Sequence, residues 1–343
     1  MREASLLRGM PVILAVALVA AVAAQQAPAP PPAPPQEDAR ADIRRRVELV
    51  VVPVTVKDSS GRLVLGIRRD EFRIFEDNEE QELALFSAEA FPLSAVLLID
   101  NELPRSAAEK VEASVTTIAA GLAPEDEATV MRFDQFPSEP EPFTANNDEL
   151  YDRLKRLKLN ETFPGIGSAA MTGGPRVNQQ SQATGVPKQA GRAPRKTKNL
   201  YDAVWAAGMH LRGVARERRK IIFLISDGRN SRDNQYNYEQ TLQLLLASEI
   251  SVYAVSVDER ALRSGGDLAR FAQATGGDVF LGRSREDLET LYTRLTEQAR
   301  HQYTLAYVPK RRDPAREYHE IEVRVRRSGL SLIAREGYFL AAP

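Results

Sequence analysis

Two hydrophobic patterns alternate through the middle of the chain. Residues 95–100 and 220–226 are built on continuous apolar runs, which are typical of strands buried on both faces of a parallel sheet. Around them, apolar residues recur every three or four positions at 111–122, 200–211 and 267–274, as in amphipathic helices. Strands that alternate with helices predict an α/β fold of the Rossmann-like kind, with a central, mostly parallel sheet and helices on both faces.

The segments on either side of this region alternate with period two, which is typical of antiparallel strands with one buried face. The first segment is 46–90, where Val52-Pro53 predicts a β-bulge. The second is 300–343. Neither has enough strands to be stable by itself. We therefore expect the two segments to combine in one small antiparallel β domain, beside an α/β domain formed by 91–299.

Three stretches lack these patterns. Residues 1–24 hold an early positive charge, a short apolar run and small residues at its end, which predicts a signal peptide. Residues 25–45 are rich in Pro and Ala and predict an extended linker. Residues 160–198 are rich in Gly, Pro, Gln and Ser and predict a flexible insertion. We expect export to the periplasm or beyond, with no membrane span left after the signal is removed.

Composition excludes several classes of function. The 46 basic and 47 acidic side chains nearly cancel, so nucleic acid is not an expected partner. The absence of cysteine excludes disulfides, thiolate metal sites and cysteine catalysis. Neither a nucleophile elbow nor a phosphate-binding glycine loop is present, and His210, His301 and His319 are expected to be structural or on the surface. We therefore expect a protein that is not an enzyme.

Two acidic residues follow the apolar runs, at the points where the predicted strands end. They are Asp100 and Asp227. Ligands of open α/β sheets bind outside the carboxyl ends of the strands, and two carboxylates there suit a hard divalent cation such as Mg²⁺ or Mn²⁺. A simpler interpretation is that both aspartates only cap the loops that follow them.

Several of these features together resemble the von Willebrand factor type A domain. The strand ending at Asp100, the helix start at 199–203 and the strand end at 224–228 occur in the order of that family, and the likeness covers about 91–299. It extends to bacterial exported proteins with a related domain, through three further motifs at 52–58, 70–77 and 335–338. The resemblance implies a protein-binding module that acts at the carboxyl-end face of the sheet.

The metal-ion-dependent adhesion site of that family is only partly present. Its first loop reads Asp-x-Ser-x-Ser, but here Glu102 and Pro104 replace the two serines after Asp100. Lys198 falls where the family has a threonine, and Thr197 is one position early. Two hypotheses follow. Either a divalent ion is held by Asp100, Glu102, Asp227 and Thr197, or the Lys198 ammonium takes the place of the ion.

The functional expectation is an exported adhesion or scaffold-type module with a protein partner that the sequence does not name. The oligomeric state is also not predicted. One alternative is a metal-dependent hydrolase that uses Asp100, Glu102 and Asp227, because carboxylates at strand ends permit a metal-activated water. Another is a purely structural protein of the cell envelope.

Overall fold

The computed structural model describes residues 49–161, 198–215, 217–259, 266–311 and 316–340. The predicted signal peptide, the predicted linker and all but the ends of the predicted insertion lie outside these residues. None of the helices within the described ranges is long and apolar enough to span a bilayer.

The centre of the described chain is a five-stranded sheet with the order β6-β5-β7-β8-β9. Every neighbouring pair in it is parallel. The strands are β5 (Leu93–Asp100), β6 (Glu127–Phe133), β7 (Arg219–Ser226), β8 (Ile250–Ser256) and β9 (Val279–Leu281). The predicted α/β fold with a parallel sheet is confirmed.

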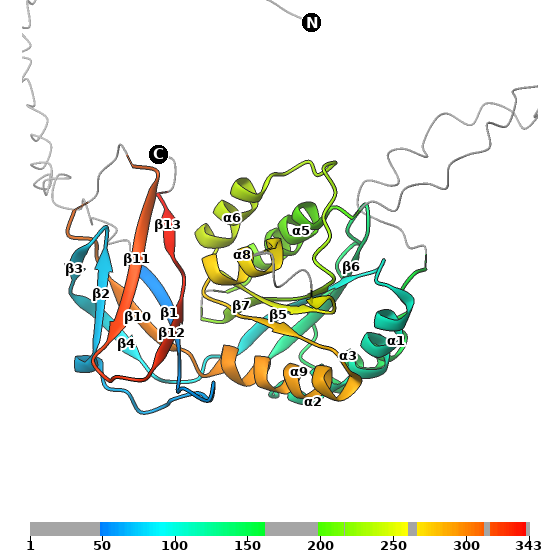
Figure 1. Ribbon diagram of the computed structural model, residues 1–343, viewed down its shortest axis with the longest axis horizontal. Coiled ribbons are helices and arrows are strands. Elements are labelled where there is room, and N and C mark those ends of the chain that lie inside the picture. The colour runs from blue at the N-terminus through cyan, green and yellow to red at the C-terminus, as the bar shows by residue number, and fades with distance from the viewer. Residues whose placement is uncertain (1–48, 162–197, 216, 260–265, 312–315, 341–343) are drawn as a thin grey trace, which may run out of the picture. The chain divides into compact units, whose positions relative to one another are not determined.

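Helices cover both faces of this sheet (Figure 1). One face carries α1 (Arg105–Ser114), α2 (Thr117–Gly121), α3 (Asn147–Lys155) and α9 (Arg285–Arg300), and the other carries α5 (Leu200–Arg212), α6 (Tyr238–Ala247) and α8 (Asp267–Ala274). Successive strand residues point to opposite faces, so Leu97 packs under the first group and Leu98 under the second. This is why the strands are apolar without interruption.

The single helix predicted over 111–122 is wrong, because the structure divides it into α1 and α2. The interruption falls at Val115 and Thr116. Side chains branched at Cβ lose rotamer freedom in a helix, which makes this the weakest stretch of the predicted segment. Both helices still bury apolar residues in the same core.

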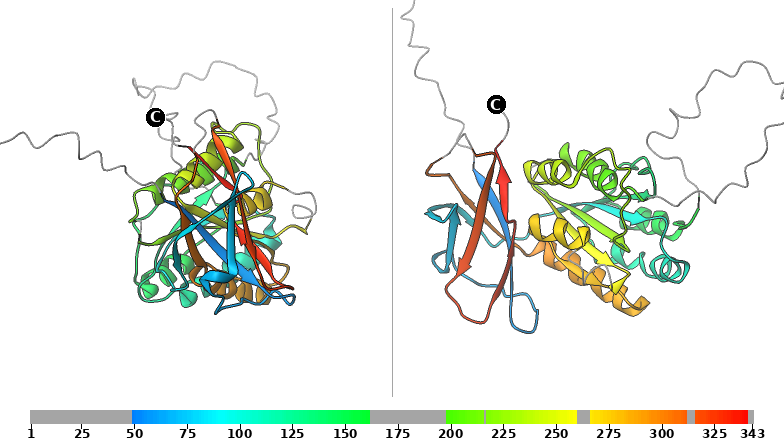
Figure 2. Two further views of the ribbon diagram at one scale, coloured as in Figure 1. Left: turned by 90° about the vertical axis from the view of Figure 1, so that its left-hand side faces the viewer. Right: turned by 45° about the horizontal axis from the view of Figure 1, so that its top comes forward.

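The remaining strands form two four-stranded antiparallel sheets in the described chain, with orders β12-β1-β10-β4 and β13-β11-β2-β3 (Figure 2). Their bounds are β1 (Val50–Lys57), β2 (Phe72–Glu76), β3 (Glu79–Gln81), β4 (Leu83–Ser87), β10 (Tyr303–Tyr307), β11 (Tyr318–Val325), β12 (Ser331–Ala334) and β13 (Gly337–Phe339). Side chains from both sheets share one core. The prediction that the two terminal segments combine in one β domain is confirmed.

The β-bulge predicted at Val52-Pro53 is wrong. β1 pairs with β10 in an unbroken register from Val50 to Val54. The pairing of β1 with β12 begins only at Val54, so Pro53 lies where one edge of β1 has no paired strand among the described residues. A residue without an N–H is tolerated at such a position.

A tight hairpin joins β2 to β3. Its two turn residues, Asp77 and Asn78, both have left-handed backbones, with φ of 47° and 67°. Positive φ at both positions defines the two-residue turn that matches the twist of antiparallel strands, and Asp and Asn tolerate it better than other residues with side chains. The turn places the Asp77 side chain beside His319 and Glu320 of β11.

Candidate functional site

The carboxyl ends of β5 and β7 bring the predicted acidic residues together. The two strands are parallel neighbours, with Ile99 opposite Ile225. β5 ends at Asp100, and Asp227 directly follows β7. Lys198 reaches the same edge of the sheet, because it lies two residues before the start of α5.

The ammonium of Lys198 lies between the two carboxylates. Its Nζ donates to Asp100 Oδ2 at 2.8 Å and to Asp227 Oδ2 at 2.9 Å. The exposed fractions of these residues are 7% for Lys198, 0% for Asp100 and 2% for Asp227. The site is therefore a buried ion-paired triad, made by residues from three separate parts of the chain.

The remaining carboxylate oxygens accept hydrogen bonds from the loops that follow the strands. Asp100 Oδ1 accepts the backbone N–H of Glu102 at 2.9 Å, and Asp227 Oδ1 accepts that of Arg229 at 3.0 Å. Ser226 Oγ adds a third donor to Asp100, 2.8 Å from Oδ2. The two aspartates thus cap their loops and bind the ammonium at the same time.

Burial dominates the electrostatics of Asp100. It raises the pKa of that carboxyl, because a charge is costly to remove from water, while the Lys198 ammonium and the Ser226 hydroxyl act in the opposite direction. Buried charges of this kind are stable only when they are paired and hydrogen bonded. Lys198 supplies that pairing for both aspartates.

The carboxylate oxygens of this site do not fit a divalent ion. Each oxygen of Asp100 and of Asp227 already accepts a hydrogen bond, and a cation bound between the carboxylates would lie against the ammonium. Thr197, the fourth predicted ligand, lies outside the described residues. Glu102 donates its backbone N–H to Asp100, and the residue lines a groove beside the triad.

The groove has a volume of about 740 Å³ and lies next to the loops that follow β5 and β7. Both apolar and charged residues line it, among them Glu102, Leu103, Pro104, Glu109, Leu159 and Arg229. The side chains of Arg105 and Arg229 are 92% and 70% exposed at its rim. It offers a mixed apolar and charged surface of the kind that contacts proteins.

No protein-family model matches the chain, and none of the curated proteins is similar to it in sequence. Among solved structures, a von Willebrand factor type A protein from Catenulispora acidiphila aligns at 11% identity over 85% of this chain and 74% of its own, with a TM-score of 0.44. The structural neighbours of this chain thus include a von Willebrand factor type A protein.

Two further solved structures have similar scores. Proximal thread matrix protein 1 from the mussel byssus is 11% identical over 65% of this chain, with a TM-score of 0.43, and the match spans about half of the mussel protein, 49%. One structure of it has a zinc-occupied MIDAS motif. BatB from Bacteroides thetaiotaomicron is 12% identical over 60% of this chain and 98% of its own, with a TM-score of 0.39.

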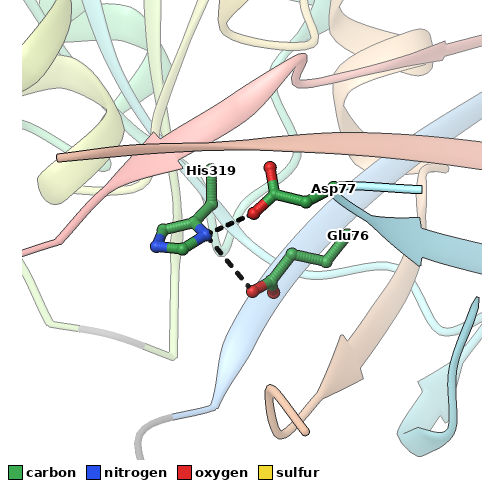
Figure 3. Close-up of side chains that lie close together, drawn as sticks. All are labelled: Glu76, Asp77 and His319. Carbon is green, nitrogen blue, oxygen red and sulfur yellow. Dashed lines mark hydrogen bonds and ion pairs between the residues drawn. The ribbon is translucent and has the colours of Figure 1, made fainter. Parts of the chain in front are cut away.

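Sequence reasoning missed a second cluster of charged residues, in the β domain. His319 of β11 lies with Glu76 and Asp77, which end β2 and begin its turn (Figure 3). The histidine is 1% exposed, so it is buried rather than on the surface. No sequence pattern indicated its two acidic neighbours. The signal lay in the pairing of β2 with β11, which a sequence does not display.

Proposed function

We propose that this chain is an exported, non-enzymatic protein-binding module of the adhesion or scaffold type. It binds its partner at the carboxyl-end face of the parallel sheet, and Lys198 takes the role that a divalent ion has in a complete adhesion site. The single observation that carries this proposal is the position of the Lys198 ammonium, which is hydrogen bonded to both strand-end aspartates.

The position of the lysine changes how a partner is recognised. A bound ion with an open coordination position can accept an acidic group from a partner. Here the ammonium is 7% exposed and its charge is used inside the triad, so recognition falls to the surrounding groove. We therefore expect binding that chelators do not affect.

The hydrolase alternative is less well supported by the same geometry. Ser226, whose hydroxyl lies beside the triad, is completely buried and donates a hydrogen bond to Asp100. Lys198 lies between two carboxylates as a cation, so it does not accept a proton from a nucleophile. A metal-activated water would need a metal site, and the carboxylates are already occupied by hydrogen bonds.

A crosslinking experiment in cells tests the proposal. A photoreactive amino acid replaces Arg105 at the rim of the groove, and the matched control replaces Glu217, an exposed residue just before β7 at the opposite end of the sheet. Crosslinks to a partner from position 105, unchanged by chelator, support the proposal. Crosslinks from position 217 alone, or from neither position, contradict it and favour the structural alternative.

A further inference from the structure

We propose a second, independent site in the β domain: Glu76, Asp77 and His319 form a binding site for a divalent transition-metal ion such as Zn²⁺. It shares no residue with the strand-end triad, and it lies in the β domain rather than in the α/β domain. Each residue offers one ligand atom, and these atoms lie within 4.8 Å of one another. The two carboxylates and the imidazole nitrogen face one another in Figure 3.

The distances suit an ion with tetrahedral coordination. His319 Nδ1 lies 2.7 Å from Asp77 Oδ2 and 3.6 Å from Glu76 Oε1. Bonds of about 2.0 Å at tetrahedral angles would place neighbouring ligand atoms about 3.3 Å apart, between these two values. Side-chain shifts of roughly half an ångström would then admit the ion. It would replace the proton that Nδ1 shares with Asp77.

Glu76 also carries a buried oxygen that is not hydrogen bonded to any described residue. Glu76 is 3% exposed, and its Oε2 has no hydrogen-bond partner in the part of the chain that the structure describes. A buried carboxylate oxygen without a hydrogen-bond partner is costly, and a divalent ion bound to Glu76 would offset that cost.

The fold holds the three ligands firmly. Asp77 is fixed by its left-handed turn, and its other oxygen accepts the backbone N–H of Glu320 at 3.1 Å and pairs with Arg316 at 2.8 Å. The His319 ring stacks on Tyr338 with centroids 5.3 Å apart. These contacts orient Asp77 Oδ2 and the imidazole toward one point without using either ligand atom, as the neighbours of metal ligands do elsewhere.

The ligand set indicates the class of ion. One imidazole nitrogen with two carboxylates suits Zn²⁺ or a similar transition metal, whereas Mg²⁺ prefers oxygen ligands in an octahedron. Asp77 gives access, because its side chain is 24% exposed while the other two ligands are buried. With three protein ligands, water would complete the coordination. The arrangement joins β2 to β11, so an ion here would stabilise the β domain.

Calorimetric titration of Zn²⁺ into the chelator-treated full chain, free of histidine tags, tests the site. Asp77→Asn is the main variant, because Asn keeps the left-handed turn while losing the charge. Glu76→Gln is a second variant of nearly equal shape, and Glu80→Gln is the matched control, a partly exposed carboxylate on β3 of the same hairpin. Circular dichroism of each variant checks the fold before titration.

One equivalent of Zn²⁺ should bind the native chain and the Glu80→Gln control, with a higher melting temperature when the ion is present. Asp77→Asn and Glu76→Gln should each weaken binding by at least about tenfold. Absence of saturable binding to the native chain overturns the site, and so does an unchanged affinity in both variants. Asp227→Asn separates the two sites, because a loss of Zn²⁺ binding in that variant alone would place the ion at the triad instead.

Discussion

Lys198 and Asp100 are 98 residues apart in the chain, yet their side chains meet in a buried hydrogen bond of 2.8 Å. The same ammonium reaches Asp227 from the other side. The chain therefore supplies its own cation at the point where two parallel strands end. We expect both the stability of the α/β domain and the chemistry at the carboxyl-end face of its sheet to depend on this one residue.

Replacing Lys198 with Met should destabilise the protein strongly. The change leaves Asp100 and Asp227 buried side by side without their cation, and breaking a buried ion pair in this way costs about 3–5 kcal/mol. Urea unfolding at neutral pH measures the loss. The matched control is Lys158→Met, because the Lys158 side chain is 60% exposed and its pairing with Glu112 is long, at 3.6 Å.

The loss of stability should be smaller when the charges of Lys198 and of the two aspartates are removed together. Lys198→Met combined with Asp100→Asn and Asp227→Asn leaves no unpaired charge, so it should recover a large part of the lost stability. If Lys198→Met and Lys158→Met unfold at the same urea concentration, the triad does not hold the fold as described.

The stability of the β domain should depend on pH through Glu71. The Arg327 guanidinium donates hydrogen bonds of 2.5 and 2.8 Å to the two Glu71 oxygens, and it lowers the pKa of Glu71 from 4.5 to about 2. Because the folded pKa is the lower one, this contribution is present above about pH 4.5 and is lost as the pH falls through about 2.

Glu71→Gln should therefore lower the melting temperature at neutral pH and have little effect near pH 2. Thermal unfolding of both proteins across this range checks the prediction, with the exposed Glu89→Gln as a control that should show no such dependence. A melting-temperature difference that is the same at pH 7 and near pH 2 would rule out the Glu71–Arg327 pair as its source.

Gly277 should not tolerate a side chain. A methyl group at this position would overlap the backbone carbonyl of Val252 in β8. Because backbone cannot move aside cheaply, Gly277→Ala should lower the free energy of unfolding by about 2 kcal/mol or more. Gly213→Ala is the control, since nothing lies within 4 Å of the added atom there. Equal unfolding free energies for the two variants would contradict this packing.

Much of the fold could be predicted because hydrophobic periodicity is a local property. The apolar runs that end at Asp100 and at Ser226 are strands as expected, and the apolar spacing over 267–274 marks α8. The errors occurred where contacts with other parts of the chain determine the local structure. The helix break at 115–116 and the regular pairing at Pro53 depend on neighbours that a sequence pattern does not contain.

The candidate site could be predicted only in part. The positions of Asp100, Asp227 and Lys198 along the chain indicated that they meet, but the choice between an ion and an ammonium needed the distances. The cluster around His319 gave no local signal, because its ligands come from strands whose pairing joins residues 242 positions apart. Short-range patterns show which elements form, while long-range pairing decides which side chains meet.

Calorimetric titration of Mg²⁺ tests the central claim most directly. Mg²⁺ avoids the mixed ligands of the β domain, so any heat reports on the strand-end site. We predict no saturable binding to the native chain, and at least about tenfold stronger binding in Lys198→Thr, which is lost again when Asp227→Asn is added. Saturable Mg²⁺ binding by the native chain that is lost in the single variant Asp227→Asn would contradict the account. So would a Lys198→Thr variant that binds Mg²⁺ no more strongly than the native chain.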